Sequence, residues 1–151
     1  MSFVAGTSRA TLSLKARALR LLSQREHARA ELARKLSPHE THEGELTQVL
    51  DELQAKGFIN ELRVVESVVH RRAPKLGTSR VRQELLAKGL AAEDIAQAVA
   101  HLQTTEFERA REVWERKFGE PAVDAAAYAK QVRFLVSRGF APEVVRRVLK
   151  A

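Results

Sequence analysis

The sequence predicts an all-α protein, an elongated, curved array of three tandem three-helix repeats with helix-turn-helix-like units. Three observations lead to this fold class. The chain has no run of alternating polar and apolar residues and no Asn-Gly or Asp-Gly hairpin turn. Apolar residues recur with helical spacing along nearly its whole length. Three stretches also resemble one another, as expected of units that stack on their neighbours and bind through an extended surface.

Nine helices are expected after a flexible tail over residues 1–13. Their ranges are 14–23, 28–36, 43–56, 61–73, 78–88, 92–103, 105–118, 124–137 and 142–150. They group into repeats over residues 14–59, 60–103 and 104–151. Several are short enough to be marginal in isolation, so packing on neighbours must stabilise them.

In the first repeat, Pro38 ends the second helix and Gly57 ends the third. The residues that share the apolar faces are Leu14, Ala18, Leu21, Leu22, Leu32, Ala33, Leu36, Leu46, Val49, Leu50 and Leu53. His27 precedes the second helix, and we expect it to cap that helix or to face solvent.

In the second repeat, Asn60 is a favourable N-cap, Pro74 ends the first helix and Gly89 ends the second. A cap at Thr104 or Thr105 should begin a separate seventh helix. The predicted core residues are Leu62, Val65, Val68, Val69, Val81, Leu85, Leu86, Ile95, Val99 and Leu102.

In the third repeat, Gly119 and Gly139 end helices, Asp124 is an N-cap, and Pro142 occupies a favoured first helical position. The predicted apolar positions are Phe107, Ala110, Val113, Trp114, Phe118, Tyr128, Val132, Leu135, Val136, Val144, Val145, Val148 and Leu149. The aromatic residues Phe107, Trp114 and Phe118 share one face, which favours a core role over base stacking.

The internal similarity falls on residues 28–36, 82–90 and 132–140. Each stretch has an apolar pair, then a basic residue, then a closing Leu or Phe. The last two continue alike over residues 90–95 and 140–145, which are offset by 50 residues. Each copy lies on the second helix of a triplet, which supports the division into three repeats.

Composition narrows the class of protein. The 151 residues include 26 Lys and Arg against 19 Asp and Glu, for a formal charge of +7. The absence of cysteine excludes disulfides, Cys-ligated zinc and thiol catalysis. There is no signal-peptide core and no apolar run of membrane-spanning length, so we expect a cytoplasmic protein with no membrane partner. A pI of about 10.2 points to a polyanionic partner or an acidic protein surface.

The charge alternates in blocks along the chain. Residues 1–38, 71–90 and 129–151 carry net charges of +6, +5 and +5, residues 39–70 and 91–108 carry −5 and −4, and residues 109–128 are balanced. A single block is typical of a solvated helix face, but three at similar spacing suggest a basic face on each repeat.

No catalytic signature occurs in the sequence. It lacks Gly-rich phosphate loops, dinucleotide fingerprints and the nucleophile elbow of hydrolases. The segment His39–Glu43 lacks the spacing of a zinc-binding helix and lies between Pro38 and Gly44, so we interpret it as a solvated acidic loop. We therefore expect a binding protein with no cofactor or metal, and not an enzyme.

Three basic groups could bind a partner, or could simply keep the surface soluble. The strongest is Arg71, Arg72, Lys75, Arg80, Arg82 and Lys88. The C-terminal group is Arg133, Arg138, Arg146, Arg147 and Lys150, and the N-terminal group is Arg17, Arg20, Arg25, Arg29, Arg34 and Lys35. Residues 75–80 should form a flexible basic loop whose hydroxyls contact phosphate or carboxylate.

Residues 25–59 also have a sequence pattern like that of a winged helix-turn-helix, which would suit a DNA-binding transcription regulator. Its recognition helix, residues 43–56, would however be acidic, and residues 60–66 begin another helix where two wing strands should follow. A general nucleic-acid-binding scaffold is a further alternative.

Taken in order, several stretches resemble the RecX family of regulators of the RecA recombinase. They are residues 23–32, 49–59, 71–77, 80–85 and 133–140, and the resemblance extends from Leu14 to Leu149. The sequence departs from the family pattern at Asn60, usually acidic, and at Val64 and Val68, usually aromatic, which we interpret as changes of cap and core.

The resemblance implies three tandem three-helix units that bind in the helical groove of RecA filaments on DNA. Such a protein would limit filament growth, and with it ATP hydrolysis, strand exchange and the co-protease activity of the SOS response. It implies Arg71, Arg72, Lys75, Arg80 and Arg82 as contacts, to which we add the basic residues of the same groups, Lys88, Arg133, Arg138, Arg146 and Arg147. Any contact with single- or double-stranded DNA should be weak and salt-sensitive.

Overall fold

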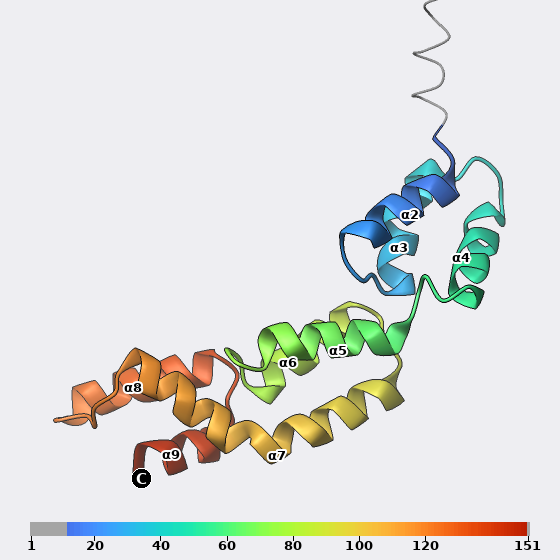
Figure 1. Cartoon of the computed structure of the whole chain (residues 1–151). Helices are drawn as coiled ribbons and strands as arrows, with labels where there is room; N and C mark the ends of the chain where they lie inside the picture. Colours follow the sequence, from blue (N-terminus) through green and yellow to red (C-terminus); the bar gives the residue numbers. More distant parts are fainter. Residues whose placement is uncertain (1–11, 151) are drawn as a thin grey trace, which may run out of the picture. The chain divides into compact units, whose positions relative to one another are not determined.

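The computed structural model describes residues 12–150, so the predicted tail lies outside the described residues except for Leu12 and Ser13. Residues 12–150 form helices and connecting turns, with no strand among them (Figure 1). The elements are α2 (Leu14–Gln24), α3 (Arg29–Leu36), the 3-10 turn η1 (Ser37–His39), α4 (Glu45–Ala55), α5 (Glu61–Arg72), α6 (Thr78–Ala87), α7 (Ala92–Lys117), α8 (Ala125–Ser137) and α9 (Pro142–Lys150). The predicted all-α class is confirmed.

The helix ends follow local signals in the sequence. The Asn60 side chain accepts a hydrogen bond from the Arg63 amide at 3.1 Å and caps α5. The Asp124 carboxylate accepts one from the Ala127 amide at 2.7 Å and caps α8. Pro142 is the first residue of α9, as predicted. The winged-helix interpretation required two strands after residue 59, but residues 61–72 are helical, so the predicted wing is absent from this segment.

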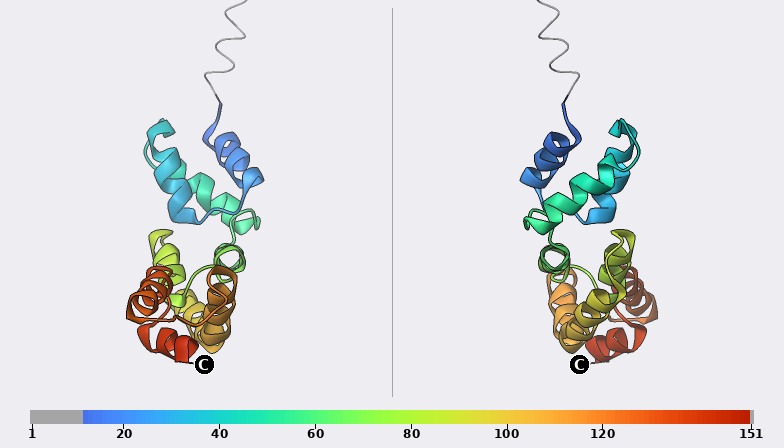
Figure 2. Two further views of the ribbon diagram at one scale, coloured as in Figure 1. Left: turned by 90° about the vertical axis from the view of Figure 1, so that its left-hand side faces the viewer. Right: turned by 90° about the vertical axis from the view of Figure 1, so that its right-hand side faces the viewer.

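The chain divides within α5 into two compact units, Met1–Val64 and Val65–Ala151. In the first unit, α2, α3 and α4 pack around one apolar cluster. Figure 2 shows these three helices from two sides. The buried members of this cluster are Leu14, Ala18, Leu32, Leu36, Leu46, Leu50, Leu53 and Ile59.

The second unit is organised by α7, which packs against α6, α8 and α9 (Figure 1). Its second half contributes Ala110 and Val113 to a cluster that also holds Leu135, Phe140, Val145 and Val148. Phe107 and Trp114 pack on this cluster, which confirms their predicted core role. Residues 65–103 of the second predicted repeat thus lie in the same compact unit as the third predicted repeat.

The predicted break at Thr104 and Thr105 is wrong, because residues 92–117 form one helix of 26 residues. The Thr104 hydroxyl donates to the carbonyl of His101 at 2.6 Å, and the Thr105 hydroxyl donates to that of Leu102 at 3.2 Å. Both side chains therefore bond to the preceding turn instead of capping a new one. With no Gly or Pro between Ala92 and Lys117, nothing interrupts the helix.

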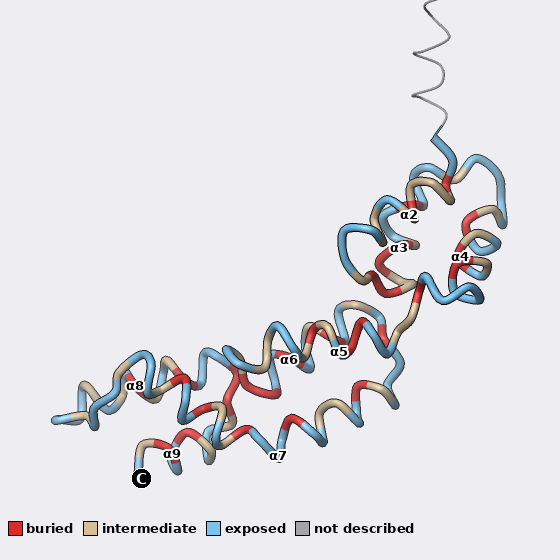
Figure 3. The backbone as a smooth tube through the Cα atoms, viewed as in Figure 1, coloured by how far each residue is buried: buried red, intermediate tan, exposed pale blue. Residues whose placement is uncertain are grey.

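Four predicted core residues are exposed instead: Leu62, Leu86, Tyr128 and Val136. Leu86 and Val136 each follow a fully buried leucine, and one residue turns a helix by about 100°, to the edge of the contact. Figure 3 shows buried positions recurring at intervals along α7, with exposed ones between them. The apolar stripe in the sequence is therefore wider than the face that each helix buries.

The expectation that His27 caps a helix or faces solvent is also wrong. Its side chain is buried between α2 and α3. Nδ1 lies 3.0 Å from the carbonyl oxygen of Arg25, and Nε2 lies 3.4 Å from Nζ of Lys35. Burial lowers the pKa of His27 below its usual 6.5, and the nearby Arg25 and Lys35 charges act in the same direction. The lowered pKa favours the uncharged ring, in which Nδ1–H donates to the Arg25 carbonyl.

Candidate interaction surface

The turn between α5 and α6 carries the basic middle segment, and α7 holds it in place. Arg109 on α7 donates from Nη1 to the carbonyls of Ala73 at 3.1 Å and Leu76 at 2.6 Å. Arg116, two turns later, donates from Nη2 to the carbonyl of Pro74 at 2.9 Å. Because the carbonyls of Ala73, Pro74 and Leu76 are all bound by arginines of α7, the predicted flexible loop over residues 75–80 is wrong. Thr78 already begins α6.

The Arg109 guanidinium is itself partly enclosed. Nη2 donates to the Thr78 hydroxyl at 3.1 Å and to the Leu102 carbonyl at 2.9 Å. Desolvation lowers the pKa of Arg109, while the charge of Glu106 one turn away opposes that change. An arginine that binds carbonyls from both segments acts as a clamp between the turn and α7.

Glu106 joins the N-termini of two helices through one buried carboxylate. Oε1 accepts from the Thr78 amide at the start of α6, at 3.2 Å, and Oε2 accepts from the Ala141 amide at the start of α9, at 2.8 Å. A negative group at a helix N-terminus satisfies an unpaired amide and interacts favourably with the helix dipole. One side chain on α7 therefore fixes α6 and α9 to each other.

A close backbone crossing completes this junction. The Gly77 amide donates to the carbonyl of Arg138 at 2.8 Å, and Arg80 donates from Nη1 to the carbonyl of Ser137 at 2.7 Å. A Cβ on Gly77 would collide with the backbone of Gly139, and one on Gly139 would collide with Arg80. Gly139 also has φ of 95°, a conformation that residues with a side chain avoid. The turn before α6 is thus fitted to the end of α8.

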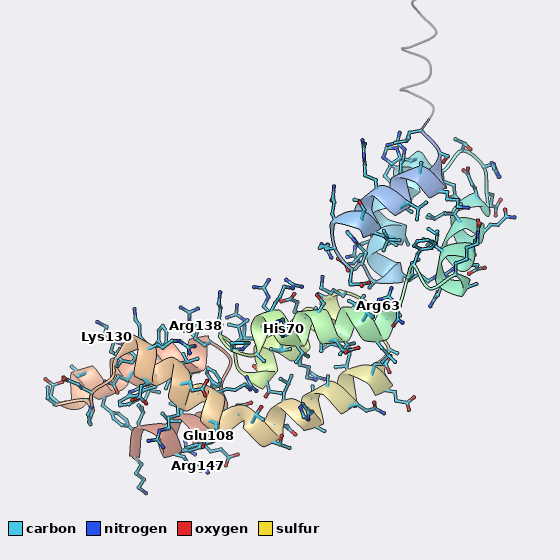
Figure 4. The ribbon with its side chains drawn as sticks, viewed as in Figure 1. Arg63, His70, Glu108, Lys130, Arg138 and Arg147 are labelled. Carbon is cyan, nitrogen blue, oxygen red and sulfur yellow. The ribbon has the colours of Figure 1, made fainter. Side chains whose placement is uncertain are left out.

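The structure gives four of the predicted binding residues intramolecular partners. Arg72 forms an ion pair with Glu84 at 2.9 Å, between α5 and α6, and Arg80 bonds to Ser137 as described above. The Arg138 guanidinium lies 4.8 Å from the ring centre of Phe134, and that of Arg147 lies 4.5 Å from the ring centre of Phe107. Figure 4 shows Arg138 and Arg147 on opposite sides of the second unit, so the C-terminal basic group is not one patch.

Five other predicted residues are exposed cations whose side chains form no hydrogen bond or ion pair within residues 12–150. They are Arg71, Lys75, Arg82, Arg133 and Arg146. Lys88 caps the end of α6 and is half-buried. Arg82 lies on α6 over a hollow of about 420 Å³ that Val136 and Pro142 also line. The free cations therefore come from α5, the following turn, α6, α8 and α9.

The N-terminal basic group separates in the same way. Arg25 pairs with Glu31 at 3.0 Å and Arg29 pairs with Asp51 at 2.7 Å, so both contribute to the first unit itself. Arg17, Arg20 and Lys35 instead line a hollow of about 210 Å³ together with His39.

Two cations that the sequence analysis did not select lie beside the C-terminal group. Arg116 and Lys117 at the end of α7 line a hollow of about 260 Å³ with Lys75 and Arg138. They were missed because residues 109–128 carry equal numbers of acidic and basic side chains. The adjacent pair Arg116-Lys117, two residues before the helix-ending Gly119, was the only signal in the sequence.

The described part of the chain contains no group of three or more His, Asp and Glu side chains placed to hold a metal ion. In residues 12–150 no helix has the length and apolar character needed to cross a membrane.

Three family models match the chain, one for each three-helix domain of RecX. The first, second and third domains match residues 15–53, 60–99 and 104–149. A protein named regulatory protein RecX from Leptothrix cholodnii is 57% identical over 144 residues, which cover 95% of this chain and 92% of that protein. A regulatory protein RecX from Ralstonia nicotianae is 50% identical over 142 residues, covering 94% and 89% of the two chains.

Solved structures show the same fold at lower identity. A crystal structure of RecX from Lactobacillus salivarius superposes with a TM-score of 0.75 at 18% identity, over 91% of this chain and 92% of that chain. Another crystal structure, titled regulatory protein RecX, has a TM-score of 0.72 at 21% identity and covers 91% and 70%.

Proposed function

Since this chain belongs to the RecX family of regulatory proteins, we propose that it is a negative modulator of the RecA recombinase. It binds in the groove of the RecA–DNA filament in the cytoplasm and limits filament growth. ATP hydrolysis, strand exchange and co-protease activity in the SOS response fall as a consequence. Family membership over nearly the whole chain is the observation that carries this proposal.

The charge of the protein supports the same partner. A filament of protein on DNA is polyanionic, and this chain has a formal charge of +7. Several weak contacts spread over three helical units gain affinity through avidity, without any single strong contact. Binding should therefore weaken as salt rises, because lysine and arginine side chains release counterions from the phosphates.

Within the ten proposed contact residues, the structure supports a division of roles. Arg72 and Arg80 bond within the second unit, so substituting them would disturb the fold as well as the surface. Arg71, Lys75, Arg82, Arg133 and Arg146 are exposed and have no partner within the described residues. We propose these five as the principal contacts. Lys88, Arg138 and Arg147 would contribute secondarily.

The test is the ATPase of cognate RecA on single-stranded DNA, with this protein titrated below one copy per RecA subunit. Loss of activity far below stoichiometry supports the capping or bridging of filaments. Loss only at high excess, rescued by added DNA, indicates competition for DNA and favours the general nucleic-acid-binding alternative. No loss at any ratio removes the proposal.

A surface variant tests the contact residues. Arg71→Glu combined with Arg82→Glu reverses two exposed charges without removing a described contact. Arg111→Glu, which reverses an exposed charge outside the proposed set, serves as the control. If the variant with both Arg71→Glu and Arg82→Glu inhibits RecA to the same extent as the wild-type protein, these two residues are not contacts.

A further inference from the structure

The hollow between the end of α7 and the end of α8 gathers four positive side chains from distant parts of the sequence. Lys75 comes from the turn after α5, Arg116 and Lys117 from α7, and Arg138 from the cap of α8. Val113 and Phe134 complete its lining. All of these residues belong to the second compact unit.

The four cations have no acidic counterpart. Within residues 12–150 none of them forms an ion pair with a carboxylate. Glu112 stands four residues before Arg116, in the orientation that favours a helical ion pair, yet Arg116 bonds to the Pro74 carbonyl instead. Four like charges around one hollow repel one another, and a bound anion would relieve that repulsion.

The positions of these side chains are also restricted before any ligand arrives. Nζ of Lys117 lies 5.3 Å from the ring centre of Phe134, and the Arg138 guanidinium lies 4.8 Å from it. Phe134 is held edge-to-face against Phe118, with 5.5 Å between ring centres. Cations that rest on an aromatic ring lose less side-chain freedom when they bind a ligand, which favours affinity.

We propose that this hollow is a phosphate-binding site. Its ligand is a phosphate group, carried either by the backbone of a nucleic-acid strand or by a small phosphorylated compound. Arginine offers paired N–H donors that match phosphate oxygens, and lysine adds a compact charge. The hollow shares Lys75 and Arg138 with the proposed filament contacts, but the inference does not depend on the proposed function, because it requires no RecA and its test contains none.

The test uses the full chain and two probes. Pyrophosphate is titrated while backbone amide shifts are followed by NMR, and a fluorescein-labelled thymidine 15-mer is titrated by fluorescence anisotropy. We expect pyrophosphate to shift the amides of Lys117 and Arg138. If the 15-mer displaces pyrophosphate, the ligand is a nucleic-acid backbone. If pyrophosphate binds and the 15-mer does not displace it, the ligand is a small phosphate compound.

The decisive comparison is between two substitutions on α7. Lys117→Glu and Arg111→Glu make the same change in charge at exposed positions, but only Lys117 lines the hollow. Lys117→Glu should weaken pyrophosphate binding about tenfold, and Arg111→Glu by less than about twofold. Lys117→Gln, which removes one charge and is milder for the fold, should fall between them. If the two glutamate variants lose pyrophosphate affinity equally, binding depends only on the overall positive charge, and the proposed site is wrong. Equal binding of a polyglutamate peptide would also show the proposed site to be wrong.

Discussion

Replacing Glu106 with alanine should strongly destabilise the second unit. The substitution removes the acceptor of the Thr78 and Ala141 amides and leaves both helix N-termini without their buried partner. It also removes the negative charge that favours the half-buried Arg109. A hydrogen bond to a charged group contributes about 1.5–3 kcal/mol, so two of them amount to roughly 3–6 kcal/mol.

That loss is a large part of the free energy of unfolding of a small protein, about 5–15 kcal/mol. Glu106→Gln keeps one acceptor oxygen and should cost about half as much, roughly 1.5–3 kcal/mol. The measurement is urea unfolding followed by tryptophan fluorescence. Trp114 is the only tryptophan, and its indole donates to Gln131 at 2.9 Å inside the second unit, so the signal reports on that unit.

The matched control is Glu108→Ala, two residues along the same helix and labelled in Figure 4. Glu108 is exposed, and the substitution changes the charge by the same amount, so we expect an effect within about 0.5 kcal/mol. If the two alanine variants unfold at the same urea concentration, the carboxylate does not join α6 and α9. The account of the junction would then be refuted.

Gly77→Ala should destabilise the second unit by about 1–3 kcal/mol in the same fluorescence assay, because the added Cβ would collide with the backbone of Gly139. An unchanged midpoint of urea unfolding would contradict the close approach of Gly77 to Gly139. His27 has a lowered pKa, so its contribution to the stability of the first unit is complete above pH 6.5 and is lost as the pH falls below that value. Hydrogen exchange of the α2–α4 amides should show this loss, and His27→Gln should reduce the pH dependence. The carboxyl group of Glu52 should titrate by NMR with a pKa of about 2, because the hydrogen bonds from Lys15 and Lys56 favour its charged form. Stability from this group is lost as the pH falls from 4.5 towards 2, and Lys56→Gln should raise the pKa of Glu52; an unchanged value would mean that the pair does not form in solution.

Local signals in the sequence predicted most helix ends correctly. Asn60 and Asp124 cap the helices they were expected to cap, and Pro142 begins α9, because each acts through its own side chain or ring. Thr104 and Thr105 were wrongly predicted to cap a new helix, because a threonine hydroxyl can also donate to a carbonyl of the preceding turn. Which of the two it does depends on whether neighbouring helices favour a continuous α7.

The candidate surface was predictable only in part. The sequence identified the basic groups, but not which members are free, because pairing partners such as Arg72 with Glu84 and Arg147 with Phe107 are distant in the chain. Arg116 and Lys117 were overlooked because the net charge of a sequence segment does not show which of its side chains lie close together in the folded protein.

The sequence by itself determined the helical class, the approximate helix ends, the basic character and the resemblance to one family. These properties depend on residue type and on spacings of a few positions, which are visible in the chain. Only the tertiary structure decided that Glu106 caps two helices, that Arg109 anchors a turn, and that four cations meet around Phe134. Each of these joins residues separated by tens of positions, and such contacts exist only once the packing of apolar faces has brought the helices together.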